Sequence, residues 1–461
     1  MRAQRSIRAP PGFLLDSRTA HADVVVIGGG LSGLAASVDL ASRGAAVLLC
    51  EAGPRLGGRC YSYVDVRTGD TVDNGQHVLL GAYHNVLEYL ARIGSVRFLK
   101  KQRSLTLPLH HPEKGFHSFS VPEVPKPFDL PAGMLRFGLL TLQDRRRLLN
   151  VGLALRGWDR NMEESLSEKT VAGWLSGLGQ SRESMECLWN PIALSVMNES
   201  PEEASALLFA RALRGAFMGE KSDSSILLPT VGQSDLYVAG AIEYLMRRKA
   251  KILLNSEVRT LAMRGSGVSH LELQGGMKVT GGFIVSAVPY FALRRMIPPE
   301  FMTETPFEGL GKIGSSPIVS IHLWFEKDFM ESDLLGLIGR RVQWLFNRRR
   351  IMRGSGKTTG YVSAVISAAR PFLHLTKERL VEIALQDIRG MYPRTGRLLC
   401  SGVIKEKRAT FSPTCGVERF RPGARTPFRN LFLAGDWTDT GLPATIEGAV
   451  VSGLKAARMS G

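Results

Sequence analysis

The stretch "ADVVVIGGGLSGLAASVDLASRGAAVLLCEAGPRLGGRC", residues 22–60, decides the fold. Residues 23–27 form a short, valine-rich apolar run typical of a buried strand, and residues 34–42 have the composition of a helix. Residues 46–50 form a second apolar run, which ends at Glu51. Strand, helix and strand in this order predict a βαβ unit, and therefore an α/β fold with parallel strands.

The turn between the first strand and the helix carries a glycine fingerprint. Gly28, Gly30 and Gly33 fit the pattern G-x-G-x-x-G. The first glycine allows a tight turn, the second lets the backbone approach a pyrophosphate, and the third lets the helix pack on the strand. Glu51, at the end of the second strand, is placed to accept hydrogen bonds from ribose hydroxyls. Together these features predict that the unit binds a dinucleotide at the N-terminus of its helix.

Length and composition indicate a globular protein with more than one domain. The chain has 461 residues, of which 44% are hydrophobic. Its cysteines, five in number, show neither a C-x-x-C pair nor metal-ligand spacing, so we expect no metal site and a reducing, cytoplasmic compartment. The first twenty residues carry scattered Arg without the apolar core of a signal peptide, and we expect no membrane-spanning helix.

The charge is strongly positive. Basic residues exceed acidic residues by 59 to 42, a formal net charge of +17. The excess gathers in clusters: "KKQR" from Lys100, "DRRRLL" from Asp144, Arg247–Arg248, Arg340–Arg341 and "NRRR" from Asn347. No nucleic-acid-binding motif accompanies them, so we expect no nucleic-acid partner. Two interpretations stay open, an anionic membrane surface on the inner face of the membrane and ordinary solvated faces.

Residues 133–158, "GMLRFGLLTLQDRRRLLNVGLALRGW", bear on the same question. They interleave Leu, Phe and Val with Arg at helical spacing. The pattern predicts either an amphipathic helix that lies on a membrane surface or a buried bundle helix with basic flanks.

Two further motifs resemble those of the superfamily of flavin-containing amine oxidases and carotenoid desaturases. Residues 51–63, "EAGPRLGGRCYSY", are similar to its second motif, which wraps the flavin, and the resemblance implies that Gly58 and Arg59 contact FAD. Residues 430–457, "NLFLAGDWTDTGLPATIEGAVVSGLKAA", are similar to its closing motif. There Gly435 follows a strand, Asp436 would bond the ribityl or pyrophosphate part, and Ile446 would begin a helix aimed at the flavin ring.

The middle of the chain resembles the same superfamily. "GGFIVSAVPY" from Gly281 is similar to its strand and A-x-P turn, and residues 235–261 to its helix followed by a strand in which the backbone of Val258 holds the adenine. The implied fold is a discontinuous Rossmann-type FAD-binding domain with an inserted α+β substrate domain. The expected division is a basic tail at residues 1–21, a FAD-binding domain at residues 22–90, 226–290 and 421–461, and a substrate domain at residues 91–225 and 291–420.

The resemblance narrows at "VDNGQHVLLGAYHNVLEYL", residues 72–90, and "WNPIALSVMNESPEEASALLFARAL" from Trp189. These segments resemble the hydroxysqualene dehydroxylase branch, also called squalene-associated FAD-dependent desaturases. The first would pass beside the flavin ring. One departure is Glu199, where the branch is expected to have threonine, and it weakens any role of Asn198.

The branch implies a reaction in which reduced flavin gives a hydride to the carbon of hydroxysqualene that loses its hydroxyl, which yields squalene. The departing hydroxyl needs a proton, and we expect His77 to supply it, with Asp73 as the second candidate and Gln76 orienting the hydroxyl. The substrate is a long apolar polyprenyl alcohol, so the substrate domain needs an apolar tunnel, with candidate walls in residues 131–156 and 205–218.

Two alternatives stay open. A carotenoid-type desaturase would remove a hydride from a phytoene-like polyene and would need no proton donor. A flavin-bound scaffold would hold other squalene-pathway enzymes together without turnover of its own. An amine oxidase is disfavoured because Cys415 is too close to Gly435 for that family's flavin-attachment cysteine.

Overall fold

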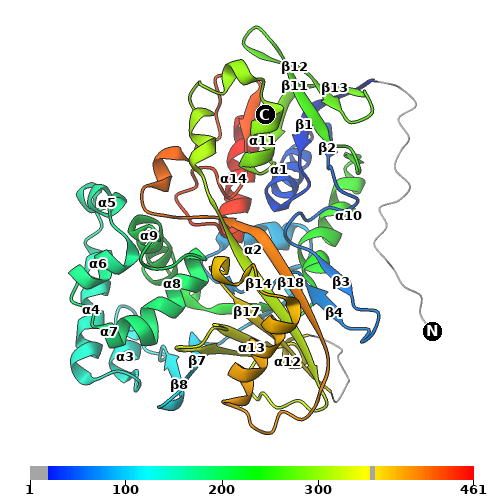
Figure 1. The fold of residues 1–461 in the computed structure, drawn as a ribbon. Coiled ribbons are helices and arrows are strands. Elements are labelled where there is room, and N and C mark those ends of the chain that lie inside the picture. Colours follow the sequence, from blue (N-terminus) through cyan, green and yellow to red (C-terminus); the bar gives the residue numbers. More distant parts are fainter. Residues whose placement is uncertain (1–18, 353–358, 461) are drawn as a thin grey trace.

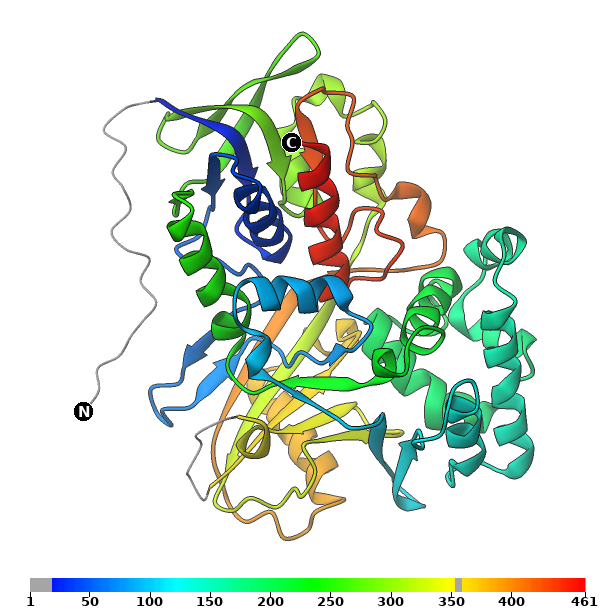
Figure 2. The same ribbon diagram turned by 180° about the vertical axis from the view of Figure 1, so that it is seen from behind.

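The computed structural model describes residues 19–352 and 359–460. Two large sheets lie side by side, and a lobe of helices flanks the second (Figure 1). The first sheet is at the top of Figure 1, with the blue helix α1 and the red helix α14 against it. The view from behind, in Figure 2, shows the first and last parts of the chain packed together on one face of this sheet. The predicted basic tail lies outside the described residues, except that residues 19–21 begin strand β1.

The first sheet is the predicted dinucleotide-binding sheet. Its order is β10 (Lys251–Leu253), β2 (Val47–Cys50), β1 (Thr19–Ile27), β13 (Lys278–Ser286), β12 (Gly267–Leu273) and β11 (Val258–Arg264), with β19 (Leu431–Leu433) also paired to β13. Strands β10, β2, β1, β13 and β19 are mutually parallel, whereas β12 is antiparallel to β13 and β11 is antiparallel to β12. The fold class predicted from the sequence, α/β with a Rossmann-type sheet, is confirmed.

The glycine turn has the geometry that its spacing predicts. Gly28 has a φ of +99° and donates its backbone N–H to the carbonyl of Cys50 at 2.7 Å. A Cβ on Gly33 would lie 1.9 Å from the carbonyl oxygen of Gly28, so only glycine lets helix α1 (Leu31–Ser42) begin this close to the strand. A Cβ on Gly30 would meet nothing within 4 Å. The fingerprint therefore combines two packing positions with one position that faces open space.

Helices from distant parts of the chain cover this sheet. Helix α1 packs against α14 (Ile446–Met459), and a Cβ on Gly453 would lie 2.2 Å from the carbonyl oxygen of Ser32. Helix α10 (Gly240–Arg247) lies beside α1, and α2 (His84–Arg92) lies against α14. The two ends of the described chain therefore meet in one layer.

The second sheet is mostly antiparallel. Its order is β18 (Leu398–Phe411), β14 (Ser315–Phe325), β17 (Gly360–Ile366), β16 (Trp344–Asn347), β15 (Leu334–Leu337), β7 (Thr106–His111) and β8 (Gly115–Ser120). Only the pair of β15 and β7 is parallel among the strand pairs described. Helix α13 (Lys377–Arg389) buries its apolar side chains with one face of this sheet.

Smaller elements join the two sheets. They are the hairpin of β3 (Ser62–Val64) and β4 (Thr71–Asp73), the three-stranded sheet of β5 (Leu79–Leu80), β9 (Ile226–Pro229) and β6 (Leu99–Lys101), and the helices α11 (Tyr290–Met296) and α12 (Arg348–Ile351). The helical lobe consists of α3 (Asp129–Arg136), α4 (Leu142–Arg156), α5 (Arg160–Ser167), α6 (Val171–Gly177), α7 (Arg182–Ser184), α8 (Asn190–Met197) and α9 (Ala206–Phe217).

The segment predicted to be one amphipathic helix, residues 133–158, falls into α3 and α4. Helix α4 buries Leu148, Val151 and Leu155 inside the lobe, as a bundle helix does. Its opposite face leaves Leu142 and Leu153 exposed, at 56% and 67% of their surface. One face of α4 therefore packs as in a bundle helix, and the opposite face exposes apolar side chains.

The strands of the first sheet come from residues assigned in advance to the FAD-binding domain and its tail, and the boundaries of the domains stay a prediction. No helix within residues 19–352 and 359–460 is both long enough and apolar enough to span a bilayer.

Candidate active site

A cavity of about 1450 Å³ runs from the glycine turn of the first sheet to the inner face of the second. Most of the residues predicted to bind the cofactor line it: Gly28, Gly30, Glu51, Gly58, Arg59, Val258, Gly435, Asp436 and Ile446. Gly33 is absent from the lining because it packs beneath the turn against Gly28. The structure thus brings residues from three distant segments to one space.

Glu51 organises the end of the cavity nearest the glycine turn. Its carboxylate accepts the backbone N–H of Gly29 at 2.6 Å with one oxygen and that of Gly53 at 2.7 Å with the other. The acid therefore fixes the turn that precedes α1 and the loop that follows β2. The remaining lone pairs of both oxygens can still accept hydroxyl donors.

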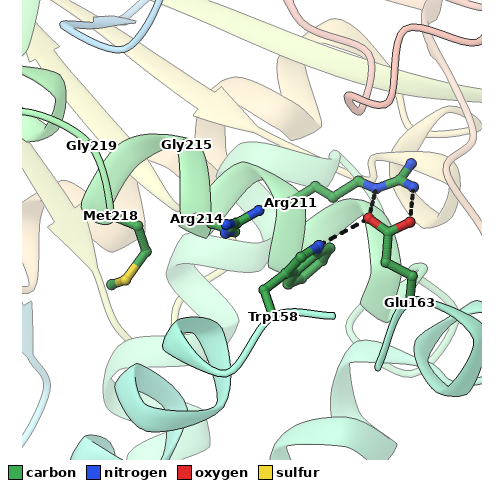
Figure 3. Close-up of a pocket in the computed structure, with 7 residues that line it drawn as sticks. All are labelled: Trp158, Glu163, Arg211, Arg214, Gly215, Met218 and Gly219. Atoms are coloured by element: carbon green, nitrogen blue, oxygen red, sulfur yellow. Dashed lines mark hydrogen bonds and ion pairs between the residues drawn. The ribbon is translucent and has the colours of Figure 1, made fainter. Parts of the chain in front are cut away.

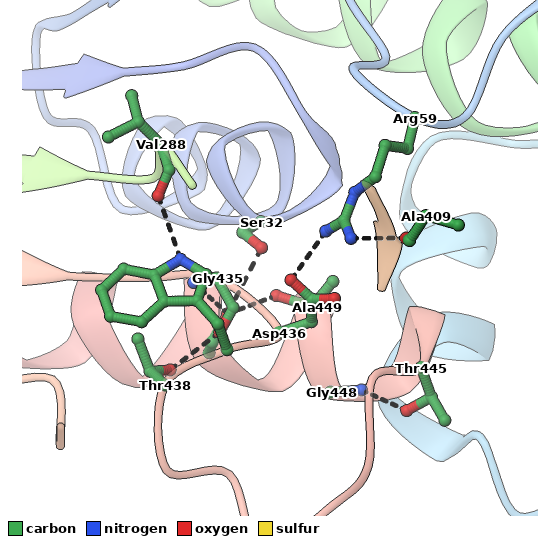
Figure 4. A network of polar contacts seen from close by, with 12 residues as sticks. Ser32, Arg59, Val288, Ala409, Gly435, Asp436, Thr438, Thr445, Gly448 and Ala449 are labelled. Carbon is green, nitrogen blue, oxygen red and sulfur yellow. Dashed lines mark hydrogen bonds and ion pairs between the residues drawn. The ribbon is translucent and has the colours of Figure 1, made fainter. Parts of the chain in front are cut away.

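Arg59 and Asp436 form an ion pair in the middle of the cavity wall (Figure 4). Arg59 Nη2 lies 2.6 Å from Asp436 Oδ1, and Nη1 donates to the carbonyl of Ala409 at 2.7 Å. The arginine side chain is 42% exposed, whereas that of Asp436 is 7% exposed. The pair joins the second motif, the closing motif and strand β18, and it leaves the guanidinium partly free to face a ligand.

The closing motif is held by hydrogen bonds between side chains and the backbone. Gly435 has a φ of +143°, and its N–H donates to Ser452 Oγ at 2.8 Å. The indole N–H of Trp437 donates to the carbonyl of Val288 at 3.0 Å, and Thr445 caps α14 by accepting the N–H of Gly448 at 3.0 Å (Figure 4). Helix α14 therefore begins at Ile446, as predicted, and directs the positive end of its dipole at the cavity.

Glu447 is a functional-site residue that the sequence did not single out. It is buried, and its carboxylate accepts the backbone N–H of Asn85 at 3.1 Å, the side-chain amide of Asn85 at 2.7 Å and the N–H of Val86 at 3.0 Å. These groups open helix α2, so an acid on one helix caps the N-terminus of another. The contact spans 361 residues and gives no local signal.

The loop predicted to pass beside the flavin ring lies in the cavity wall. Gln76 and His77 line the cavity, together with Asn74. Asp73 does not: it is buried behind the wall, where it accepts the N–H of Gln233 at 3.0 Å and lies 2.7 Å from Arg348 Nη2. We therefore correct the expectation that Asp73 reaches a ligand, because both of its oxygens serve buried protein donors.

His77 is held neutral by its surroundings. Burial, with a further contribution from the positive charge of Arg59, lowers the pKa of His77 to about 4. Its Nδ1 is buried without a hydrogen-bond partner among the described residues, and its ring lies 6.1 Å from that of Tyr237. Protonation of His77 therefore costs free energy, and the protonated ring is correspondingly more acidic.

The basic cluster "NRRR" corrects a prediction of surface charge. Arg348 is buried and pairs with Asp73 at 2.7 Å. The side chain of Arg349 is 6% exposed and pairs with Asp70 at 2.6 Å. The third arginine of the cluster, Arg350, is half exposed and lies 3.5 Å from Asp333. The cluster therefore fastens the hairpin of β3 and β4 to the second sheet and offers little to an anionic surface.

The far end of the cavity is apolar. Its walls include Leu105, Leu107, Ile192, Val196, Leu213, Ala216, Phe217, Ile226, Leu334, Phe346 and Val365. Of the two segments predicted as walls, α9 contributes directly, whereas residues 131–156 do not line the cavity. Beyond the cofactor-binding residues, the space is suited to a long hydrocarbon.

Asn198 and Glu199 have separate roles. Asn198 lines the cavity, accepts the N–H of Ala368 at 2.8 Å and donates to Thr410 Oγ1 at 2.9 Å. Glu199 points away from the cavity and forms a two-point ion pair with Arg370, at 2.6 and 2.8 Å. The departure from the expected threonine thus supports the fold and leaves Asn198 at the wall.

A second hollow, of about 520 Å³, adjoins the cavity across helix α9 (Figure 3). Arg211 and Gly215 line both spaces. Glu163 joins Arg211 at 2.9 Å and accepts the indole N–H of Trp158 at 3.0 Å. Arg214 lies over the ring of Trp158, 5.3 Å from its centre. The hollow is open, basic and aromatic, in contrast to the apolar end of the cavity.

The family pattern described as flavin containing amine oxidoreductase matches residues 31–459. The chain belongs to this family. It is 31% identical to the hydroxysqualene dehydroxylase of Rhodopseudomonas palustris, over 96% of this chain and 98% of that protein. It is 30% identical to the hydroxysqualene dehydroxylase of Zymomonas mobilis, over 94% and 98%.

The resemblance to the hydroxysqualene dehydroxylase branch is confirmed by these relatives. A 15-cis-phytoene desaturase from an Oncidium hybrid is more distant, at 25% identity over 95% of this chain and 77% of that protein. Among solved structures, an oxidoreductase from Methanosarcina mazei superimposes with a TM-score of 0.73 at 16% identity, over 94% of this chain and 99% of that one. The last comparison supports the fold.

This member of the flavin-containing amine oxidoreductase family is an FAD-dependent oxidoreductase, and its cavity fits FAD. Gly30 leaves space where a side chain would stand, at the N-terminus of α1. Among the described residues, the buried atoms Asn74 Oδ1 and His77 Nδ1 have no hydrogen-bond partner, and both residues line the cavity together with Arg59 and Ile446. A polar ring system is the kind of group that such atoms require.

Replacement of Glu51 by alanine is expected to weaken FAD binding by about one to two orders of magnitude. The variant loses hydrogen bonds from the ribose to a charged acceptor, each of roughly 1.5–3 kcal/mol. It also loses the two contacts that fix the loops. The measurement is FAD retained after dialysis, with Glu51→Gln as the isosteric control expected to lose less. A Glu51→Ala protein that stays fully yellow would contradict the assignment.

Proposed function

We propose that the protein removes the hydroxyl group of hydroxysqualene and replaces it with hydrogen, which gives squalene and water. The observation that carries the proposal is the continuity of the cavity, in which the FAD-binding residues pass directly into an apolar space through a short polar wall at Asn74, Gln76 and His77. An uncharged polyprenyl alcohol has this distribution of chemistry, one polar group on a long hydrocarbon. The relatives named hydroxysqualene dehydroxylase support the same substrate.

Bound FAD, in its reduced form, supplies the hydride that the carbon receives. The protein positions the substrate, keeps water away from the reacting carbon and supplies a proton. The apolar walls around Leu213 and Phe217 bury the hydrocarbon chain and exclude water from the reacting carbon. Gln76 presents an amide to the hydroxyl, and His77 stands next to it as the candidate proton donor.

The low pKa of His77 has two opposed effects on this role. An imidazolium of pKa about 4 is a stronger acid than a free histidine and gives up its proton readily to a departing hydroxyl. At pH 7 it is present in roughly one molecule in a thousand. On the proposed mechanism, the low population of the protonated form should make the rate depend on pH.

The proposal is tested with protein reduced anaerobically and mixed with hydroxysqualene. Reoxidation of the flavin together with squalene in the mass spectrum is the expected result. Bleaching of the oxidised flavin by a phytoene-like polyene, without any reaction of hydroxysqualene, would establish the desaturase alternative instead. Absence of turnover with both compounds would leave the flavin-bound scaffold.

The reoxidation rate should rise as the pH falls, by about tenfold per unit between pH 7 and 5, because His77 must gain a proton before it can donate one. His77→Gln should remove this slope and slow the reaction by roughly 10²–10⁴, with cofactor content unchanged. Since the pKa of His77 is lower in the folded chain than in the unfolded one, stability declines as the pH falls through 6.5 toward 4. Melting temperatures at each pH are therefore the control. A flat profile for the parent protein would exclude His77 as the acid.

We propose further that an anionic membrane surface meets the exposed face of helix α4, next to the basic hollow. The exposed face of α4 carries Leu142, Arg146, Leu153 and Arg156 along one stripe, an alternation of apolar and basic residues. Trp158 follows directly and lines the basic hollow next to the cavity. This stripe would let the leucines enter the interface while the arginines meet lipid phosphates.

Leu153→Glu should reduce co-sedimentation with anionic vesicles on the order of tenfold, since it removes an inserted side chain and adds a repelled charge. The matched control is Val66→Glu, which makes the same charge change at a residue that is 94% exposed on the hairpin of β3 and β4. Binding of the parent should also weaken at high salt. Equal losses in the two variants would show that only net charge matters and would reject the stripe.

A further inference from the structure

We propose that Arg348 is a positioning residue that fixes the side-chain amide of Gln76 so that one of its N–H groups is turned to the cavity. Arg348 is almost fully buried, at 1% of its surface. One arm of its guanidinium, Nη1, donates to Gln76 Oε1, and the other, Nη2, lies 2.7 Å from Asp73 Oδ2. Arg348 thus binds the carboxylate of Asp73 behind the cavity wall and the amide of Gln76 in the wall.

The orientation of the amide follows from the chemistry of the guanidinium. Arginine has N–H donors and no acceptor, so the atom of Gln76 that faces Arg348 must be the carbonyl oxygen. The reversed amide would set two donors against each other in a buried site. A free glutamine presents either atom to a ligand, whereas Gln76 held by Arg348 does not.

One hydrogen of the amide remains for a ligand. Gln76 Nε2 donates to the backbone carbonyl of His77 at 3.1 Å, and within residues 19–352 and 359–460 it has no second acceptor. Because Gln76 lines the cavity, the remaining N–H can meet a ligand only as a donor. The group that it recognises is therefore an acceptor, either an oxygen or nitrogen of the flavin ring or the oxygen of the departing hydroxyl.

The loop that carries Gln76 is fixed from a second side. Gln233 donates its backbone N–H to Asp73 at 3.0 Å and its side-chain amide to the carbonyl of Gly75. Arg348 itself follows strand β16 of the second sheet. The position of the amide is thus set where the loop between β4 and β5 meets the second sheet.

The test combines Arg348→Lys, Gln76→Met and the double variant in FAD-loaded protein. Lysine keeps a positive charge for Asp73 but lacks the fork that reaches Gln76 as well. The matched control is Arg349→Lys, which changes a neighbouring arginine that pairs with Asp70 and does not line the cavity. Cofactor content and melting temperature are recorded for each protein.

Two readouts separate the two possible acceptors. The midpoint potential of bound FAD, measured without substrate, shifts if the amide serves the flavin ring. The reoxidation rate with hydroxysqualene falls by about 10- to 100-fold, at unchanged potential, if it serves the hydroxyl. The second readout rests on the proposed function, whereas the first does not. If the parent protein does not react with hydroxysqualene, the proposed function is refuted. The midpoint potential then decides whether Arg348 positions the amide.

In the affected readout, Arg348→Lys and Gln76→Met should have similar effects, and the double variant should match Gln76→Met within about twofold, because Arg348 acts through the amide. Arg349→Lys should resemble the parent. Additive losses, or an Arg348→Lys protein that matches the parent in both readouts, would overturn the proposal. If Arg348→Lys does not fold, Gln76→Glu decides: it keeps the acceptor for Arg348 but turns an oxygen to the cavity, and an effect smaller than that of Gln76→Met would overturn the proposal.

Discussion

Two glycine contacts bring helix α1 so close to its neighbours that backbone meets backbone on two sides. The rest of the structure depends on this constraint. At its start, Gly33 packs on the carbonyl of Gly28, and along its flank Gly453 of α14 packs on the carbonyl of Ser32. The first contact aims the N-terminus of α1 at the cavity. The second places α14, which carries Glu447 and the closing motif, in the same layer. Neither contact tolerates a side chain without a shift of backbone.

Local patterns in the sequence were sufficient for the cofactor half of the molecule. The glycine spacing, the apolar runs on either side and Glu51 all act over a few tens of residues, and the structure shows them in the predicted places. The start of α14 was implied by the family resemblance, and in the structure Thr445 caps this helix. The third glycine of the fingerprint differs from the first two because it does not line the cavity.

Long-range charge pairs were not predictable. Asp73 lies in a segment that was predicted to be catalytic, and Arg348 lies in a basic run of the kind that is usually exposed to solvent. The two partners are 275 residues apart in the sequence. Burial decides the role of each, since an unpaired charge in that interior would be expensive and a paired one is tolerated. Glu447 shows the same limit. Its sequence context describes the first turn of α14, and its carboxylate serves the first turn of α2.

The meeting of the two ends of the described chain has a consequence for biosynthesis. The cavity takes part of its wall from the glycine turn after β1 and part from α14, which ends at Met459. The closing segment supplies three of the nine lining residues predicted to bind the cofactor, Gly435, Asp436 and Ile446. A nascent chain therefore lacks these three until α14 has been synthesised, and we expect tight binding of FAD only after that point.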